Sequence, residues 1–261
     1  MLVADIYSVL NEQFPFSNAP KWDPVGLQLG DMEADAGRVA VAHEVTESVV
    51  ESVLSNGIAT VVAYHPLLFD PVTAVVAGRT PQGRALRLLG AGVSLLVVHT
   101  AMDVAPQGTS DALLVSLGVK TAGSFAETDE GSGQFIGRFG SLIDPSSAGV
   151  FAAFVSRELS ATVQFAGDPD SIISSVATVP GSGSSFIAEA AEVADVYITG
   201  DVSHHRAQSG IEQGVVVLNP GHIPTERPGV AHLYDSVSKA VSDAVFITDD
   251  PHPWEDVSWK I

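Results

Sequence analysis

The strongest constraint on the fold is a repeated alternation of short apolar runs with amphipathic stretches. In the first half of the chain, apolar runs lie at residues 38–43, 58–63 and 93–98. Helix-start signals separate them, such as Thr46 followed by an acidic residue. Near-continuous apolar strands between helices are typical of a parallel sheet that is covered on both faces. The pattern predicts an α/β protein with mainly parallel or mixed sheets flanked by helices.

The same alternation extends along the whole chain, and residues 15–30 are expected to form a shaped loop because Pro and Gly interrupt them. The expected helices are residues 3–14, a segment started by Thr46, and residues 81–89, 110–117, 148–159, 185–193, 204–213 and 230–241. The expected strands of the second half are residues 135–139, 162–165, 175–179, 196–199, 215–218 and 244–248.

The length of 261 residues allows one large domain or two smaller ones. Residues 120–133 combine Gly and Ser with acidic residues and are the best candidate for a linker. We therefore expect an N-terminal α/β lobe at residues 1–125 and a C-terminal α/β lobe at residues 126–261. The C-terminal helix of the second lobe can pack back on the first.

Composition excludes several classes of partner. Twelve Lys and Arg against 31 Asp and Glu give a formal net charge of −19, which repels a phosphate backbone and argues against a nucleic-acid partner. No apolar run reaches the roughly 20 residues that span a bilayer, and the start lacks a secretory signal, so we expect a soluble protein without a membrane partner. The absence of cysteine fits a cytoplasmic location and restricts any metal site to nitrogen and oxygen ligands.

Chemistry is concentrated in polar islands that follow predicted strands. Ligand sites of open α/β sheets lie beyond the carboxyl ends of the strands, and imidazoles or carboxylates there are costly to bury alone. A shared metal ion or a hydrogen-bond network makes their convergence favourable. The four islands are Tyr64-His65-Pro66, His99-Thr100-Ala101-Met102-Asp103, Thr199-Gly200-Asp201, and Gly221-His222-Ile223-Pro224-Thr225-Glu226.

Spacing within two of these islands is informative. His99 and Asp103 are four residues apart, as are His222 and Glu226, so one helical turn would bring each pair to one side. Asp103 is either a metal ligand or a partner that orients a ligating imidazole. For the second pair, N-terminal helix capping by Thr225 and Glu226 is the alternative, but capping leaves His222 unexplained. His65 precedes a proline that stiffens its loop.

Other candidates rank lower. His204 and His205 open a predicted helix, where a solvated pair is at least as expected as a functional one. His232 is expected on a helix surface, and His252 lies in a proline-rich tail. The side chain of His43 either leans toward a cleft at the carboxyl ends of the strands or packs behind its own strand. Gly-x-Ser-x-Gly is absent, so a serine hydrolase is disfavoured.

Taken together, the islands resemble the Nif-three-like family, also called GTP cyclohydrolase I type 2 homologues. The resemblance covers nearly the whole chain, and the order and spacing of the motifs make it specific. It is carried by Trp22-Asp23-Pro24-Val25-Gly26-Leu27-Gln28-Leu29-Gly30, Tyr64-His65-Pro66-Leu67-Leu68-Phe69, and the three later islands given above.

The resemblance implies two related α/β lobes, a dinuclear metal centre in the cleft between them, and a homo-oligomer, often a ring-like hexamer. It assigns metal ligation to His65, Asp103, His222 and Glu226, with His99 close by as ligand, orienting partner or proton carrier. The family usually carries two adjacent histidines where this chain has Tyr64-His65. Tyr64 is therefore expected to bind one ion weakly, to leave that site partly empty, or to form only a hydrogen bond.

Two functions fit this chemistry. In the first, two divalent ions of zinc, iron or manganese generate hydroxide, and His99 moves a proton in hydrolysis of a nucleotide or a related small molecule. In the second, the ions organise a ligand cleft of a non-catalytic binding or regulatory module. The sequence is compact, without the large inserted domain that some relatives carry.

Overall fold

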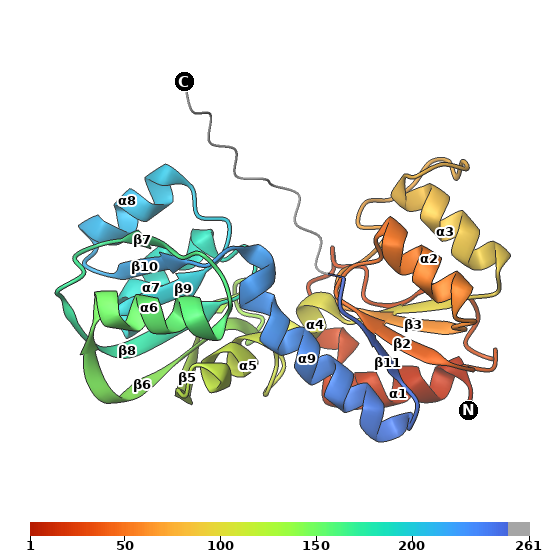
Figure 1. Cartoon of the computed structure of the whole chain (residues 1–261), viewed down its shortest axis with the longest axis horizontal. Coiled ribbons are helices and arrows are strands. Elements are labelled where there is room, and N and C mark those ends of the chain that lie inside the picture. Colours follow the sequence, from red (N-terminus) through yellow and green to blue (C-terminus); the bar gives the residue numbers. More distant parts are fainter. Residues whose placement is uncertain (250–261) are drawn as a thin grey trace.

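The computed structural model describes residues 1–249 and contains two β-sheets, each flanked by helices (Figure 1). This confirms the mixed α/β class that the alternating pattern predicts. His252 lies outside the described residues. None of the helices in residues 1–249 combines the length and the apolar character needed to cross a bilayer.

The first sheet has five strands in the order β1-β4-β3-β2-β11. Strands β2, β3, β4 and β11 are parallel, and β1 is antiparallel to β4. Their bounds are β1 Gly26–Leu29, β2 Val39–Ala42, β3 Thr60–Ala63, β4 Ser94–Val97 and β11 Val245–Ile247. The expectation of a loop throughout residues 15–30 is wrong for β1, because that segment pairs antiparallel with β4 as the edge strand of the sheet and buries Leu29.

Both faces of this sheet are covered, which explains why β2, β3 and β4 are buried at every position and are largely apolar. Val41 and Val62 pack in one cluster with helix α1 (Val3–Gln13), whereas Ala40 and Val61 face helices α2 (Glu47–Ser55) and α3 (Pro81–Gly90). Successive side chains of a strand point to opposite faces, so a sheet buried on both sides selects a continuous apolar run. Thr46 caps α2 by accepting a hydrogen bond from the Val49 amide, as its sequence predicts.

The second sheet has six strands in the order β5-β6-β8-β9-β10-β7, with β8, β9 and β10 parallel. Strand β5 begins at Lys120, so residues 120–127 are not the linker that we expected. These residues alternate between exposed and more buried positions and pair antiparallel with β6. A search for continuous apolar runs does not detect a strand of this kind. The bounds are β5 Lys120–Glu127, β6 Phe135–Ser147, β7 Gln164–Ala166, β8 Ile172–Val179, β9 Val196–Thr199 and β10 Val216–Asn219.

The remaining helices connect or cover this second sheet. Ala148 and Val155 of α6 pack on one face, and Ile187 and Ala190 of α7 on the other. The helices are α4 His99–Val104, α5 Thr109–Ser116, α6 Ala148–Glu158, α7 Ile187–Val193 and α8 His204–Glu212, with short 3-10 turns at Phe16–Asn18 and Ser184–Phe186.

Helix α9 (His222–Ala240) joins the two parts of the molecule (Figure 1). It leaves β10 of the second sheet, packs against α5 and α1, and leads into β11 of the first sheet. It begins eight residues before the expected residue 230, because Pro224 and Pro228 hide its start in the sequence. Pro224 lies in the first turn, where a missing N–H costs no intrahelical hydrogen bond. Helix α9 contacts β2 of the first sheet and β9 of the second, so it lies between the two sheets.

Candidate metal centre

Three histidines lie at the exits of three adjacent parallel strands. Strands β2, β3 and β4 pair in register, so that His43, His65 and His99 follow them at one edge of the sheet. The His65 amide donates to the His43 carbonyl at 2.9 Å, and the His99 amide donates to the Tyr64 carbonyl at 3.0 Å. The convergence of imidazoles at the carboxyl ends of the strands follows directly from this register.

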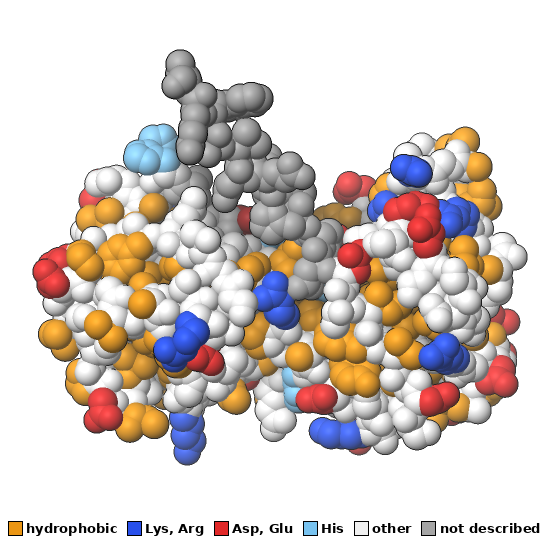
Figure 2. Space-filling model, in the orientation of Figure 1, with side chains coloured by type: hydrophobic (Ala, Val, Ile, Leu, Met, Phe, Trp, Pro, Cys, Tyr) orange, Lys and Arg blue, Asp and Glu red, His pale blue; other side chains and the backbone are white. Residues whose placement is uncertain are grey.

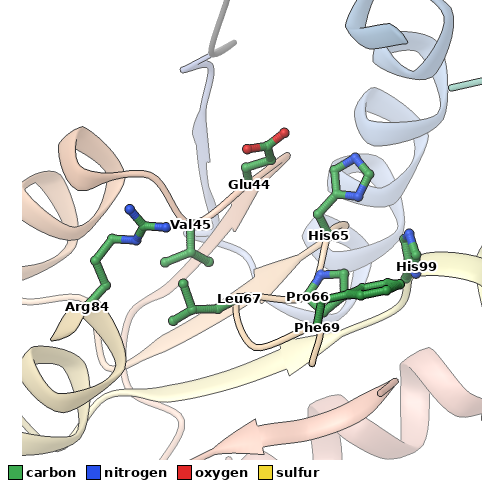
Figure 3. Close-up of a pocket in the computed structure, with 8 residues that line it drawn as sticks. All are labelled: Glu44, Val45, His65, Pro66, Leu67, Phe69, Arg84 and His99. Carbon is green, nitrogen blue, oxygen red and sulfur yellow. The ribbon is translucent and has the colours of Figure 1, made fainter. Parts of the chain in front are cut away.

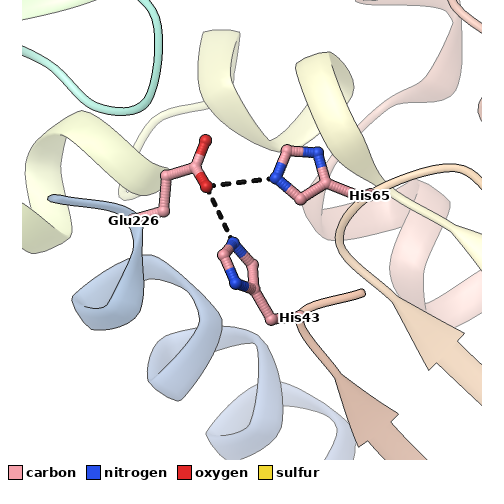
Figure 4. A group of neighbouring side chains, drawn as sticks. All are labelled: His43, His65 and Glu226. Atoms are coloured by element: carbon pink, nitrogen blue, oxygen red, sulfur yellow. Dashed lines mark hydrogen bonds and ion pairs between the residues drawn. The ribbon is translucent and has the colours of Figure 1, made fainter. Parts of the chain in front are cut away.

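Glu226 approaches the same edge from the first turns of α9 (Figure 4). Its side chain is buried, and its Oε2 lies 2.7 Å from His43 Nε2 and 3.1 Å from His65 Nε2. Its other oxygen, Oε1, lies 3.1 Å from Nε2 of His222. One buried carboxylate is therefore shared by three imidazoles, two on one oxygen and one on the other.

The charge of Glu226 is stabilised by these neighbours. Burial alone raises the pKa of this carboxyl, but hydrogen bonds from His222, His43 and His65 outweigh burial and hold its pKa well below the usual range. His43, His65 and Glu226 each offer one atom within 4.8 Å of the others, which is a group that can hold a metal ion.

His222 lies between two carboxylates. Its Nδ1 is 2.7 Å from Oδ2 of Asp201, the last residue of the Thr199-Gly200-Asp201 island, and its Nε2 faces Glu226. Burial lowers the pKa of His222, but the two carboxylates outweigh burial and raise it to about 9. Gly200 permits this approach, because a Cβ there would lie 2.7 Å from the backbone nitrogen of His222.

His99 is held by Asp23 of the N-terminal motif. Its Nδ1 lies 2.8 Å from Asp23 Oδ1, and the Thr100 amide and hydroxyl both donate to Asp23 Oδ2. Burial lowers the pKa of His99, but the hydrogen bond with Asp23 and the charge of Asp103 outweigh it and raise that pKa. His99 adopts a φ of 33°, in the left-handed region that residues with a Cβ rarely occupy. Residues with such strained backbone conformations cluster at functional sites.

Tyr64 and Asp103 bind each other. The Tyr64 hydroxyl donates to Asp103 Oδ1 at 2.7 Å, and the Thr109 hydroxyl donates to the same oxygen. Burial, opposed by the charge of His99, raises the pKa of Asp103. Burial and the charge of Asp103 raise the pKa of Tyr64 well above its usual value.

The structure brings the predicted site residues to one place, in two groups. His65, His222 and Glu226 form the hydrogen-bonded group, while His99, Asp103 and Tyr64 line its flank, with the His65 ring centroid 5.2 Å from that of His99 and 4.7 Å from that of Tyr64. His204 and His205 lie outside it, at the exposed start of α8. Figure 2 shows exposed histidine side chains at the upper left of the surface, over the region where Figure 1 places α8. His232 is half-buried and contacts Gln13, rather than lying free on the surface.

Sequence reasoning left His43 unresolved, although a signal was present. His43 directly follows β2, and Tyr64-His65 directly follows β3, so the register of these two strands places His43 beside them. What the sequence lacks is the position of α9, which brings Glu226 onto the His43 ring.

Two cavities open on the site. A pocket of about 400 Å³ has His65 and His99 at one end and Arg84 at the other, with Glu44 above and Phe69 below (Figure 3). A larger cavity of about 1130 Å³ is lined by His222 and Asp201, and Glu44 also contributes to it. Both offer polar side chains to a small molecule.

The fold and this cluster define a two-sheet α/β protein in which a His and Glu group that can hold a metal ion lies at the carboxyl edge of the first sheet. Comparison with known sequences makes the assignment specific: the Duf34/NIF3 (NGG1p interacting factor 3) family profile matches residues 1–253, and the chain belongs to this family.

Curated relatives carry the name GTP cyclohydrolase 1 type 2 homolog. The Clostridium perfringens protein is 27% identical over 95% of both chains, and the Streptococcus pneumoniae protein is 30% identical over 85% of both. Among solved structures, a hypothetical protein from Staphylococcus aureus superposes with a TM-score of 0.86 at 24% identity, covering 98% of this chain and 99% of that one. A Bacillus cereus protein related to NIF3 gives 0.87 at 19% identity, with the same coverage. These structures share the fold.

Proposed function

We propose that the chain is a metal-dependent hydrolase that acts on a nucleotide or a related small molecule, and that Glu226, His65, His222 and Asp103 would hold two divalent ions. The observation that carries this proposal is the division of the Glu226 carboxylate. Its Oε2 faces His43 and His65, and its Oε1 faces His222. Each carboxylate oxygen thus has imidazole nitrogen beside it, which is a donor set that would suit the paired ions of a metal-dependent hydrolase.

The donor set fits such ions. His65 and His222 offer nitrogen, Glu226 and Asp103 offer oxygen, and the chain has no cysteine. Zinc, iron(II) and manganese all suit imidazole with carboxylate. The buried, ionised Glu226 supplies the negative charge that a cation neutralises.

When bound, two such ions lower the pKa of a coordinated water and supply hydroxide near neutral pH. The proposed role of His99 is proton transfer. Asp23 occupies its Nδ1, which leaves Nε2 to exchange a proton with the substrate. The hydrogen bonds of Asp23 also fix the orientation of the ring, as an orienting carboxylate does for a catalytic histidine.

Substrate binding is assigned to the pocket beside His65 and His99. Arg84 lines it and is suited to pair with a phosphate or carboxylate group. The net charge of −19 offers little general attraction to a polyphosphate, so Arg84 and the ions would carry that recognition. The name shared by the relatives points to ring-opening hydrolysis of a purine nucleotide, and phosphoester hydrolysis uses the same chemistry.

The test is a substrate screen with protein loaded with zinc or manganese, in which formate reports ring opening and inorganic phosphate reports phosphoester cleavage. We expect turnover that His65→Ala and Glu226→Ala abolish while circular dichroism stays unchanged. His205→Ala, on the exposed surface of α8, is the matched control and keeps full activity. If the metal-loaded protein binds nucleotides without turnover, the function is that of a metal-dependent binding module and not of a hydrolase. If the protein binds no divalent ion, both functions are wrong.

A further inference from the structure

His43 and Tyr64 occupy neighbouring positions at the site. Ala42 of β2 pairs with Ala63 of β3, so the next residue of each strand emerges beside the other. The Tyr64 amide donates to the Ala42 carbonyl at 3.0 Å, and the His43 and Tyr64 rings stack with centroids 5.7 Å apart. Either residue is therefore placed to reach the Glu226 side of the cluster.

Only one of the two does so. The Tyr64 hydroxyl donates a hydrogen bond to Asp103 Oδ1 at 2.7 Å and is thereby directed to the flank of the site. The His43 Nε2 instead lies 2.7 Å from Glu226 Oε2, the oxygen that also meets His65. His43 thus belongs to the group of three residues whose atoms can share one ion.

Burial of His43 also needs an explanation. The residue is 3% exposed, and its Nε2 points at Glu226 Oε2 beside His65. The Nδ1 on the far side of the ring is buried without a hydrogen-bond partner among the residues that the structure describes, and a cation on Nε2 leaves it so. The case for ligation therefore stands on the Nε2 side of the ring, where two imidazoles share one carboxylate oxygen. A cation held between His43, His65 and Glu226 gives this polar ring a function that a packed apolar residue could not serve.

We propose that His43 is a metal ligand on the Oε2 side of Glu226, and that Tyr64 is not a ligand but a hydrogen-bond donor that positions Asp103. In this chain the imidazole on the Oε2 side comes from the exit of β2, next to Tyr64 at the exit of β3. This inference rests on the metal centre of the proposed function but not on turnover.

The experiment measures zinc binding by purified full-length protein. Zinc per chain is determined by mass spectrometry after removal of excess metal, and affinity is determined by competition with a chromophoric chelator. We expect His43→Ala and His43→Gln to lose one zinc per chain or to bind it at least about 100-fold more weakly. Changing a residue that only hydrogen-bonds to a metal ligand already lowers metal affinity by roughly 10- to 100-fold. Tyr64→Phe keeps every zinc ion and weakens binding by no more than the roughly 10- to 100-fold that loss of a residue positioning a ligand brings. The surface control His205→Ala binds zinc as the wild type does.

A second readout separates ligation from packing. Cobalt(II) replaces zinc, and its visible absorption bands report the ligands: they change in His43→Gln and persist in Tyr64→Phe. Melting temperatures with chelator and with zinc then test folding. If His43 is a ligand, zinc raises the melting temperature of His43→Gln less than that of the wild type. If His43 only packs, the melting temperature of His43→Gln with chelator is lower than that of the wild type, and zinc still raises it by the same amount.

Should both single His43 variants fail to fold, the double variant with His43→Ala and Tyr64→His decides. Recovery of zinc binding by this relocated imidazole supports the proposal, and failure to recover it counts against it. Unchanged zinc affinity in His43→Gln, or loss of an ion in Tyr64→Phe, overturns the inference while leaving the metal centre intact. Absence of zinc from the wild-type protein overturns the proposed function itself.

Discussion

Asp201 lies 2.7 Å from Nδ1 of His222, on the side of the ring opposite Glu226. This pair joins the exit of β9 to the start of α9 and surrounds one imidazole with two carboxylates. The arrangement favours a doubly protonated ring in the metal-free protein, with a pKa raised from 6.5 to about 9. In the proposed metal centre, a metal ion would therefore compete with a proton for His222.

The first prediction is proton release on metal binding. At pH 7.5 zinc displaces about one proton from His222, because a ligating imidazole must give up the proton on its ligating nitrogen. Calorimetry in two buffers with different ionisation enthalpies measures this number. Asp201→Asn lowers the pKa of His222 and shrinks the release. Equal release in both proteins would contradict the role of Asp201.

The same pair has a consequence for the metal-free protein. Because folding raises the pKa of His222, its contribution to stability is fully present below pH 6.5 and is lost as the pH rises through about 9. Ligation of His222 in the proposed metal centre would remove this dependence. Denaturation measured with chelator from pH 6 to 10 checks the sign, with Asp201→Asn as the variant whose profile is flatter.

The second prediction concerns Asp23 and His99. Asp23→Asn removes the charge that accepts from His99 Nδ1, so the pKa of His99 falls. Nuclear magnetic resonance of the His99 ring across a pH titration measures the shift, and Thr100→Val serves as a control that removes one donor to Asp23 but keeps the carboxylate. A His99 titration unchanged in Asp23→Asn would rule out this dyad as the source of its basicity.

The third prediction is a pH-dependent stabilisation at Asp195, far from the metal centre. Its carboxylate accepts hydrogen bonds from the amides and hydroxyls of Ser174 and Ser175. Burial opposes these bonds, but together they lower the pKa of Asp195. Its contribution is present above the ordinary value of 3.8 and is lost as the pH falls through the lowered value. Asp195→Asn should cost about 1 kcal/mol in urea unfolding at pH 7. This difference in the free energy of unfolding should shrink toward pH 2. A difference that stays constant with pH would contradict the prediction.

The fourth prediction concerns assembly. Phe69, Val75 and Val76, on the loop between β3 and α3, expose large apolar side chains, and Val76 is 67% exposed. Exposed apolar clusters mark interaction surfaces, and the sequence resemblance implies a homo-oligomer. Light scattering should give a mass above that of one chain, which Val76→Asp reduces. Val150→Asp, at a comparably exposed position on α6, is the control and leaves the mass unchanged. A monomeric wild type would contradict this expectation.

Much of the fold follows from the apolar runs, but edge strands escape them. Strands β2, β3 and β4 are buried on both faces, so their pattern is continuous and their exits could be placed. Strand β5 exposes every second residue along its first half, and β1 lies at the sheet edge within a Pro and Gly-rich stretch. Their pairing depends on partners that are distant in sequence.

The candidate site divides in the same way. His65, His99, His222 and Glu226 could be proposed from strand exits and four-residue spacing. The role of His43 could not, because an imidazole after a buried strand reads equally well as packing. Only the path of α9, which brings Glu226 to the exits of β2 and β3, distinguishes the two.

Completion of the first sheet by β11 affects how the chain matures during synthesis. Residues 39–97 contribute three parallel strands early, but the fourth arrives only with residues 245–247, after the whole second sheet has been made. Such pairing across about 200 residues is entropically slow, and the nascent N-terminal segment emerges from the ribosome with an open sheet edge. His43 and His65 meet Glu226 only after residue 226 has been made, so metal binding at the proposed centre is expected late in synthesis.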